Sequence, residues 1–198
     1  MATPRQLSST GWYHAIGRGN NRQPLFLDRP DFERFLLILG KYLTKHPVKI
    51  AHYCLMPNHV HLLLFSELRD SLSKYLQGVN LSYSWWYRNR YDFCGHVWQG
   101  RFKSFPIEKE SYLTECSRYI ERNPVNAKIV THPEKYPWSS YRFYSEGAKN
   151  HLVTPDPGYR NLASTEAARQ NIYQSYVETA RPYEIPDAKK LLPSFQGW

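Results

Sequence analysis

Two histidines separated by one apolar residue are the first candidates for chemistry in this chain. His59 and His61 lie within the largely apolar stretch Cys54–Phe65. Side chains two positions apart on a β-strand share a face, so both imidazoles are expected on one face, with Val60 and Leu62 in a core on the other. Two imidazoles on a rigid strand supply two ligands of a small metal site. A structural or simply exposed histidine pair is the alternative that the spacing alone leaves open.

A second candidate set lies on a predicted helix from about residue 109 to residue 122. Tyr119 and Asn123 are four residues apart, so they share one helical face. A phenol oxygen can attack phosphorus to form a phosphotyrosine ester, while a metal ion polarises the phosphate. That ester keeps the bond energy for rejoining, so the reaction needs no ATP. Tyr112 lies on the same face and is a rival nucleophile, and packing in the core is an alternative role for either tyrosine.

The order of the predicted elements decides where these residues would meet. Strands are expected at 11–17, 48–55, 59–65 and 97–107, and helices at 31–43, 72–91 and 109–122. The order β-α-β-β-α-β followed by a helix predicts an α+β, ferredoxin-like (split βαβ) antiparallel sheet with packed helices. In this topology the first and third strands are central neighbours. His59 and His61 would therefore lie beside the strand that leads into the turn Arg18–Arg22, with Tyr119 on the helix after the fourth strand.

The charge of the chain favours a polyanionic partner. Lys and Arg number 26 against 17 Asp and Glu, which gives a net charge of +9, and 16% of the residues are aromatic. Residues 145–198 carry six basic and six acidic side chains, so the whole excess lies in residues 1–144. Basic residues interleaved with aromatic ones suit single-stranded nucleic acid, because bases stack on rings and cations follow phosphates. A basic protein with an aromatic core explains the same composition.

Candidate contacts to DNA come from charge and placement. The turn Arg18–Arg22 offers amides and guanidinium groups to a phosphate or a base edge, although a solvated strand-to-loop connection has the same composition. Arg101 and Lys103 would share one face of the fourth strand and could lie beside a phosphate backbone. The predicted set of DNA contacts is Arg18, Asn20, Asn21, Arg101, Lys103 and Arg122.

The sequence divides into a domain at 1–144 and a C-terminal extension at 145–198. Residues 131–144 are predicted to wrap over the core, residues 145–163 are linker-like, and a helix capped by Ser164 is expected at 165–180. The three cysteines are far apart and form no CxxC pair, which favours inert thiols in a reducing cytoplasm over disulfides or a cysteine zinc site. The longest apolar run, residues 35–39, is too short to span a membrane.

Four pieces of the sequence, taken together, resemble one known family. They are the turn Arg18–Arg22, the stretch Met56–Leu63, the segment Tyr119–Val125 and the segment Tyr136–Tyr141. His59-Val60-His61 resembles the His-hydrophobic-His motif of HUH endonucleases. The four pieces in this order resemble the REP-associated tyrosine transposases, a branch of the single-tyrosine transposases tied to repetitive extragenic palindromes in bacterial chromosomes. The resemblance covers about residues 10–144.

This resemblance implies a role for each matching residue. His59 and His61 would bind a divalent metal, Mg²⁺ or Mn²⁺, and Tyr119 would be the nucleophile. Asn123 matches the position where relatives carry a third, amide-bearing ligand, often glutamine. Family members cut single-stranded DNA next to a hairpin, leaving a 5′-phosphotyrosine and a free 3′-OH, and a cytoplasmic, nucleoid-associated bacterial enzyme is expected. A module that only binds structured DNA and a zinc-dependent hydrolase are the alternatives, and monomer or homodimer is left open.

Overall fold

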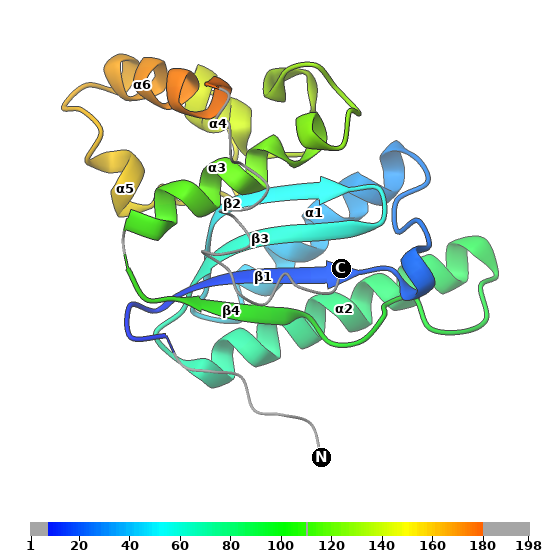
Figure 1. Ribbon diagram of the computed structural model, residues 1–198. Coiled ribbons are helices and arrows are strands. Elements are labelled where there is room, and N and C mark those ends of the chain that lie inside the picture. Colours follow the sequence, from blue (N-terminus) through cyan, green and yellow to red (C-terminus); the bar gives the residue numbers. More distant parts are fainter. Residues whose placement is uncertain (1–7, 110, 180–198) are drawn as a thin grey trace.

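The computed structural model describes residues 8–109 and 111–179. Its sheet and helices are drawn in Figure 1. The described strands are β1 (Trp12–Arg18), β2 (Lys49–Met56), β3 (His59–Phe65) and β4 (Lys103–Ile107). The described α-helices are α1 (Arg29–Leu43), α2 (Arg69–Tyr91), α3 (Ser111–Asn126), α4 (Tyr141–Glu146), α5 (Pro157–Arg160) and α6 (Glu166–Glu178). Two short 3₁₀ turns, η1 (Asn20–Arg22) and η2 (Pro133–Lys135), complete the described elements.

The four strands form one antiparallel sheet in the order β2-β3-β1-β4. This order confirms the predicted ferredoxin-like arrangement, with the first and third strands side by side at the centre. In the register of β1 and β3, Arg18 lies opposite His59 and Ile16 lies opposite His61. The two histidines therefore stand at the middle of the sheet, near the end of β1 that leads into η1.

Helices α1 and α2 cover one face of this sheet. Val60 and Leu62 of β3 point into the same cluster as Phe35 of α1 and Tyr75 of α2, and all four side chains are buried. Each fully buried side chain of this size contributes about 1.5–3 kcal/mol by leaving water. The two-residue periodicity of β3 is thus fixed by the core, and His59 and His61 must face the other way.

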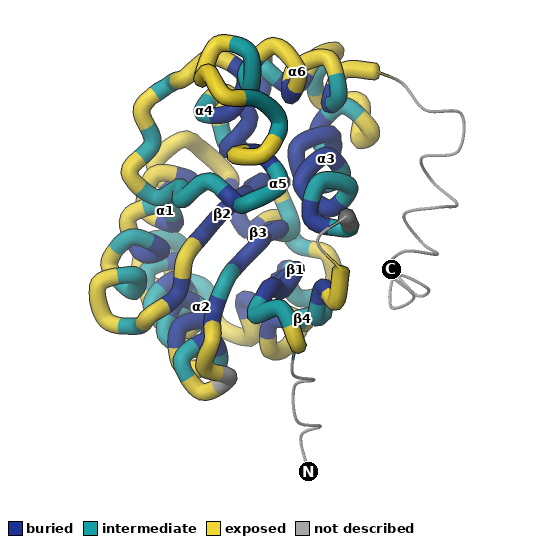
Figure 2. The backbone as a smooth tube through the Cα atoms, turned by 90° about the vertical axis from the view of Figure 1, so that its left-hand side faces the viewer, coloured by how far each residue is buried: buried dark blue, intermediate teal, exposed yellow. Residues whose placement is uncertain are grey.

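Helix α3 covers the opposite face of the sheet. The strands lie between α1 and α2 on one side and α3 on the other (Figure 2). Leu113, Cys116 and Ile120 of α3 pack against Leu63 of β3 and Met56 of β2. Tyr119, three residues after Cys116, packs against the same cluster, so its ring lies toward the face that carries the two histidines.

The fourth strand is shorter than predicted. Residues 97–102 do not join the sheet as a strand, since Val97 and Trp98 are buried among the residues that pack with α1 and α2. The backbone there bonds to the end of β1 instead, with the Gln99 amide donating to the Arg18 carbonyl at 2.8 Å. The segment is therefore hydrogen-bonded to the Arg18–Arg22 turn. Strand β4 begins only at Lys103.

Helix α3 does not end at the Asn123-Pro124 pair as predicted. It continues through Pro124 to Asn126. A proline inside a helix supplies no N–H for the carbonyl four residues earlier, which here is that of Ile120. The side-chain amide of Asn123 donates to this carbonyl at 3.4 Å and to the Tyr119 carbonyl at 2.7 Å. The asparagine thus compensates for the proline locally.

The C-terminal part packs on the sheet and on α3 instead of forming a linker. Helix α4 spans the predicted boundary between residues 144 and 145. The Thr154 amide donates to the Ile50 carbonyl of β2 at 2.8 Å, so residues expected to be a linker lie along the sheet edge. Helix α6 is capped by Thr165, not by Ser164, because the Thr165 hydroxyl accepts from the Ala168 amide at 3.3 Å. Residue 180, the predicted end of this helix, and the rest of the C-terminal extension lie outside the described residues.

Candidate active site

His59 and His61 lie on the face of β3 that α3 covers. Their ring centroids are 5.0 Å apart at an interplanar angle of 84°, and His61 is 2% exposed while His59 is half-buried. The structure therefore places both imidazoles on one face, as the spacing predicts.

Asn58 determines which nitrogen of His59 carries the proton. The Asn58 amide nitrogen donates to the Arg22 carbonyl at 3.2 Å, which directs its amide oxygen to the other side. That oxygen lies 2.7 Å from Nδ1 of His59 and can only accept, so Nδ1 of His59 donates. Nε2 of His59 then carries the lone pair, which is the arrangement a metal ligand needs.

A third histidine, which the sequence analysis did not single out, completes the cluster. His14 of β1 is fully buried, and its Nε2 lies 3.0 Å from Nδ1 of His61. The two rings are stacked, with centroids 5.2 Å apart. The only signal in the sequence is that His14 and Arg18 have the same parity on β1, so they share the face of His59 and His61 once β1 and β3 are paired.

Tyr119 is the helix-borne tyrosine that meets this cluster. Its ring lies edge-on to His61 at 5.6 Å and to His14 at 6.0 Å. Tyr112, the rival nucleophile, packs instead at the margin of the apolar α3 cluster, with the Lys109 ammonium 5.8 Å from its ring. Burial, together with the nearby Cys116, raises the pKa of Tyr119 to about 12. The phenol is therefore protonated at neutral pH and must lose its proton to attack.

The same burial keeps the histidines neutral. It lowers the pKa of His14 to about 3, and burial with the charge of Arg18 lowers the pKa of His59 to about 4. Burial, followed by the neighbouring His59 and His14 and by Arg18, lowers the pKa of His61 well below its usual value. Neutral imidazoles hold lone pairs at physiological pH, which is the state that binds metal ions.

The donor set suits a divalent metal only if non-acidic ligands complete it. Among residues 8–109 and 111–179, no group of three or more His, Cys, Asp or Glu side chains is arranged to hold a metal ion. His59 and His61 fit as two imidazole ligands. In the described chain the Asn123 amide nitrogen bonds back to its own helix and makes no hydrogen bond to either histidine. A metal at this site would take its remaining ligands from an amide or substrate oxygen and from water.

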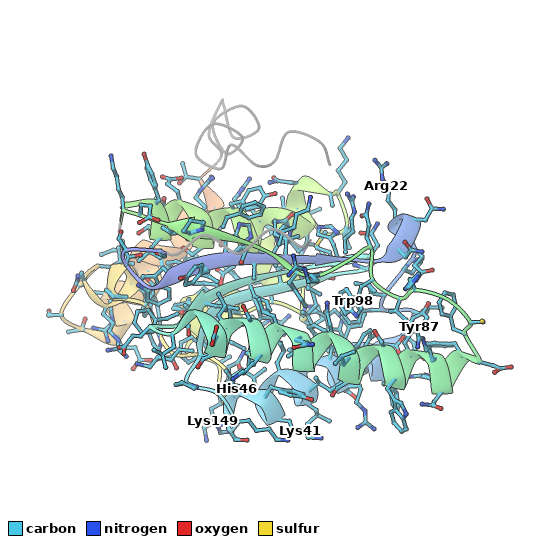
Figure 3. All side chains as sticks on the ribbon, turned by 90° about the horizontal axis from the view of Figure 1, so that it is seen from below. Arg22, Lys41, His46, Tyr87, Trp98 and Lys149 are labelled. Carbon is cyan, nitrogen blue, oxygen red and sulfur yellow. The ribbon has the colours of Figure 1, made fainter. Side chains whose placement is uncertain are left out.

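The predicted DNA contacts comprise three exposed residues, two half-buried residues and one buried residue. Arg101, Lys103 and Asn21 are exposed, while Asn20 and Arg18, which lies opposite His59, are half-buried. Figure 3 shows the neighbouring Arg22 projecting outward at the end of β1. These residues form a basic rim at the His59 end of the sheet.

Arg122 does not belong to this rim. Its side chain is buried, and its Nη1 donates to the carbonyls of Val177 at 2.8 Å and Glu178 at 3.2 Å. Arg118 makes similar bonds to the carbonyls of Tyr176, at 2.9 Å, and Thr179. The two guanidinium groups satisfy carbonyls at the C-terminal end of α6, where cations are favoured. This position does not suit a DNA contact, and charge alone could not distinguish it from the exposed arginines.

A buried ionic cluster joins α3 to the C-terminal helices, and the sequence analysis missed it. His52 of β2 places Nδ1 at 2.8 Å from Glu121 and Nε2 at 3.0 Å from Asp156, and all three are buried. Glu121 also accepts from Ser140 and Tyr173, each at 2.7 Å. Burial alone would lower the pKa of His52, but the charges and hydrogen bonds of the two carboxylates raise it to about 9. His52 is therefore an imidazolium held between two carboxylates.

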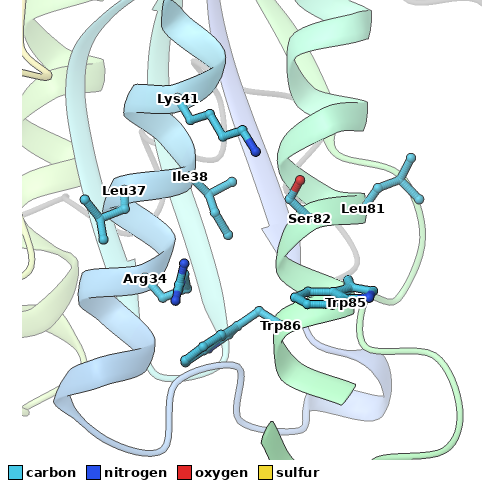
Figure 4. Close-up of a pocket in the computed structure, with 8 residues that line it drawn as sticks. All are labelled: Arg34, Leu37, Ile38, Lys41, Leu81, Ser82, Trp85 and Trp86. Atoms are coloured by element: carbon cyan, nitrogen blue, oxygen red, sulfur yellow. The ribbon is translucent and has the colours of Figure 1, made fainter. Parts of the chain in front are cut away.

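A separate apolar groove lies between α1 and α2. Figure 4 shows Trp86 of α2 extending toward Arg34 of α1, with Trp85 beside it on α2. Trp85 is 70% exposed, whereas the guanidinium of Arg34 covers the Trp86 ring at 4.2 Å. The residues that line this groove include neither a histidine nor a carboxylate, so the groove lacks the side chains that usually bind metal ions.

Comparison with known proteins identifies a matching family and similarly folded structures. A family model described as "Transposase IS200 like" matches residues 8–123. A solved structure of a REP-associated tyrosine transposase bound to a REP hairpin superposes with a TM-score of 0.60 at 19% identity, covering 79% of this chain and 93% of that one. A putative transposase from Deinococcus radiodurans R1 gives a TM-score of 0.43 at 18% identity, covering 62% and 97% of the two chains. No curated protein matches the chain significantly. The described residues include no helix long and apolar enough to cross a membrane.

Proposed function

This chain belongs to the IS200-like transposase family, and on that basis we propose that it cuts and rejoins single-stranded DNA beside a hairpin with Tyr119 as the nucleophile. The observation that carries the proposal is the placement of the Tyr119 ring, edge-on to His61 at 5.6 Å, on a helix packed over β2 and β3. The tyrosine lies beside neutral imidazoles, and basic side chains lie at the same end of the sheet. This arrangement suits attack on a phosphodiester better than it suits a purely structural role in the core.

The reaction exchanges one phosphodiester for another. The Tyr119 oxygen attacks phosphorus, the bond from phosphorus to the 3′ oxygen breaks, and that oxygen takes up a proton to leave as a free 3′-OH. The phenol proton is lost in the same step, and the raised pKa of Tyr119 means that this loss needs assistance. In the reverse direction a 3′-OH attacks the 5′-phosphotyrosine and restores the tyrosine, so strands are rejoined without ATP.

The residues around Tyr119 would bind the metal ion and the DNA. His59 and His61 would hold Mg²⁺ or Mn²⁺, with Asn123 as the proposed third ligand; the ion, when bound, would polarise the scissile phosphate. The basic rim of Arg18, Asn20, Asn21, Arg101 and Lys103 would follow the DNA backbone. Arg122 is not included in this set because its Nη1 donates to backbone carbonyls of α6. The hairpin is proposed as the partner because the similarly folded transposase is bound to one.

The test is covalent capture of a DNA strand. The purified chain is incubated with Mn²⁺ and a single-stranded oligonucleotide that carries a hairpin and its flanks. We expect a protein–DNA adduct whose peptide mapping places the DNA on Tyr119, and its loss in Tyr119→Phe. Tyr112→Phe is the matched control because this tyrosine is on the same helix but does not contact the histidine cluster. An adduct that persists in Tyr119→Phe, or cleavage without any adduct, would refute the assignment.

A hairpin-binding module without cleavage is the second candidate function. The observation in its favour is that the described residues offer no acidic ligand beside His59 and His61, which would make a metal site weak. It predicts that the hairpin binds tightly while the DNA stays intact with Mg²⁺, Mn²⁺ or Zn²⁺ present. A zinc hydrolase using the two histidines would instead bind zinc stoichiometrically and form no adduct.

A further inference from the structure

His14 holds His61 through a hydrogen bond between two ring nitrogens. Nε2 of His14 lies 3.0 Å from Nδ1 of His61, and the rings are 0% and 2% exposed. The bond joins the two central strands of the sheet, β1 and β3, whose pairing holds the two residues on the same face. The ring of His14 is further flanked by Tyr119 at 6.0 Å and by Phe105 at 6.5 Å. Both imidazoles therefore have fixed orientations.

A bond between two ring nitrogens contains one proton, and its position decides what His61 can do. If His14 donates, Nδ1 of His61 is the acceptor and Nε2 of His61 carries the hydrogen of the neutral ring. If His61 donates from Nδ1, its Nε2 carries the lone pair. Only the second arrangement leaves His61 able to bind a metal through Nε2. His59 already has this arrangement, because the Asn58 oxygen accepts from its Nδ1.

His14 itself is not placed as a third ligand. Its Nε2 is directed at the ring nitrogen of His61 and not at a space shared with His59. The described residues also contain no group of three or more histidine, cysteine or acidic side chains arranged around a metal position. The role that the geometry leaves for His14 is to act on His61.

We propose that His14 is a positioning residue that accepts the Nδ1 proton of His61 and so keeps Nε2 of His61 available to a divalent metal ion. This inference rests on the proposed function, in which His59 and His61 bind the metal. In protein metal sites, removing the partner of a ligating histidine typically weakens metal binding 10–100-fold. A loss of that size is expected when His14 can no longer accept a proton.

The test measures Mn²⁺ affinity without DNA or cleavage. Mn²⁺ is titrated into wild type, His14→Leu and His14→Gln, and free Mn²⁺ is followed by electron paramagnetic resonance. We expect His14→Leu to bind Mn²⁺ 10–100-fold more weakly. We expect His14→Gln to stay close to wild type, because the glutamine oxygen can accept a proton near the position of Nε2. Circular dichroism and hairpin affinity in EDTA verify that both variants are folded.

The outcomes separate a failure of the positioning role from a failure of the proposed metal site. Wild-type affinity in His14→Leu, or equal losses in both variants, would overturn the positioning role while leaving the metal site intact. A wild-type protein that binds no Mn²⁺ would overturn the proposed metal site and this inference together. A second readout needs no metal: ¹⁵N NMR of the metal-free protein should show His61 protonated at Nδ1, and protonation at Nε2 would contradict the proposal.

Discussion

Nδ1 of His52 lies 2.8 Å from Oε1 of Glu121, and Glu121 is two residues from Tyr119 on α3. This link ties the helix of the proposed nucleophile to strand β2. On its other side His52 bonds to Asp156, at the start of α5, and Glu121 accepts from Tyr173 of α6. The C-terminal part of the chain thus helps to position α3 through the hydrogen bonds of Asp156 and Tyr173.

The charge of His52 makes stability fall as the pH rises above neutrality. Its pKa is about 9 in the folded state against 6.5 when unfolded, so its contribution is complete below pH 6.5 and is lost as the pH approaches 9. The shift corresponds to about 3 kcal/mol in total. We expect the contribution of His52 to the free energy of unfolding to drop by roughly 2 kcal/mol between pH 6.5 and 8.5, measured by urea denaturation of wild type and His52→Gln.

The other buried histidines titrate in the opposite sense. The pKa values of His14, His59 and His61 are lowered in the folded state, so these residues add stability until their unfolded forms have lost their charge, about one pH unit above 6.5. The measured quantity is therefore the difference in the free energy of unfolding between wild type and His52→Gln, in which residue 52 cannot titrate. A difference that stays constant between pH 6.5 and 8.5 would show that His52 is not charged between the carboxylates.

Removing the Tyr173 hydroxyl should weaken the contact between α3 and α6. Tyr173→Phe deletes a fully buried 2.7 Å hydrogen bond to the Glu121 carboxylate, and bonds to charged groups contribute about 1.5–3 kcal/mol. The matched control is Tyr176→Phe, which deletes a bond of equal length to the half-buried Glu115 on the same two helices. Urea unfolding should show the larger loss for Tyr173→Phe. Equal losses would mean that the buried cluster is no more important than the surface contact.

The sequence predicted the parts of the site that depend on local periodicity. Two-residue alternation placed His59 and His61 on one face, and helical spacing placed Tyr119 on α3. His14 could not be identified, because its bond to His61 requires the register of β1 against β3. The partners of His52 could not be predicted either, because they come from distant parts of the chain; Asp156 is 104 residues away in sequence. The burial of Arg122 could not be predicted either, because charge gives no information on burial.

Lys103 should contribute to DNA binding through a phosphate. Its side chain is exposed at the start of β4, opposite Ile16 of β1 and on the face of the sheet that carries His61. Lys103→Gln should reduce hairpin affinity and lower the slope of log affinity against log salt by about one. Lys41→Gln is the control, because Lys41 lies on α1 beyond the opposite face (Figure 3). Fluorescence anisotropy at several salt concentrations measures both slopes, and equal slopes for the two variants would exclude Lys103 as a phosphate contact.

Arg122 should behave as a structural residue. Arg122→Met removes the donors to the carbonyls of Val177 and Glu178 at the end of α6, leaving buried acceptors without that partner. We expect a loss of about 1–3 kcal/mol in the free energy of unfolding. The salt dependence of hairpin binding should match wild type. A reduced salt slope with unchanged stability would restore Arg122 to the set of DNA contacts.

Gly19 should be essential to the shape of the basic rim. A Cβ at this position would lie 2.2 Å from the Gln23 carbonyl oxygen, and backbone cannot yield as a flexible side chain can. Gly19 also donates to the Asn58 carbonyl at 2.9 Å, so a shift there would disturb the turn that orients His59. Gly19→Ala should therefore lower the free energy of unfolding by more than about 1 kcal/mol and weaken hairpin binding.

Gly40 provides the matched comparison for Gly19. It lies inside α1, where an added methyl group meets only the movable Leu152 side chain at 3.1 Å. Alanine is favoured over glycine within a helix by roughly 0.5–1 kcal/mol, so Gly40→Ala should leave stability unchanged or raise it. Hairpin affinity should stay at the wild-type value. Urea unfolding and fluorescence anisotropy on the two alanine variants separate the effects, and a Gly19→Ala protein as stable as Gly40→Ala would show that the turn tolerates a side chain.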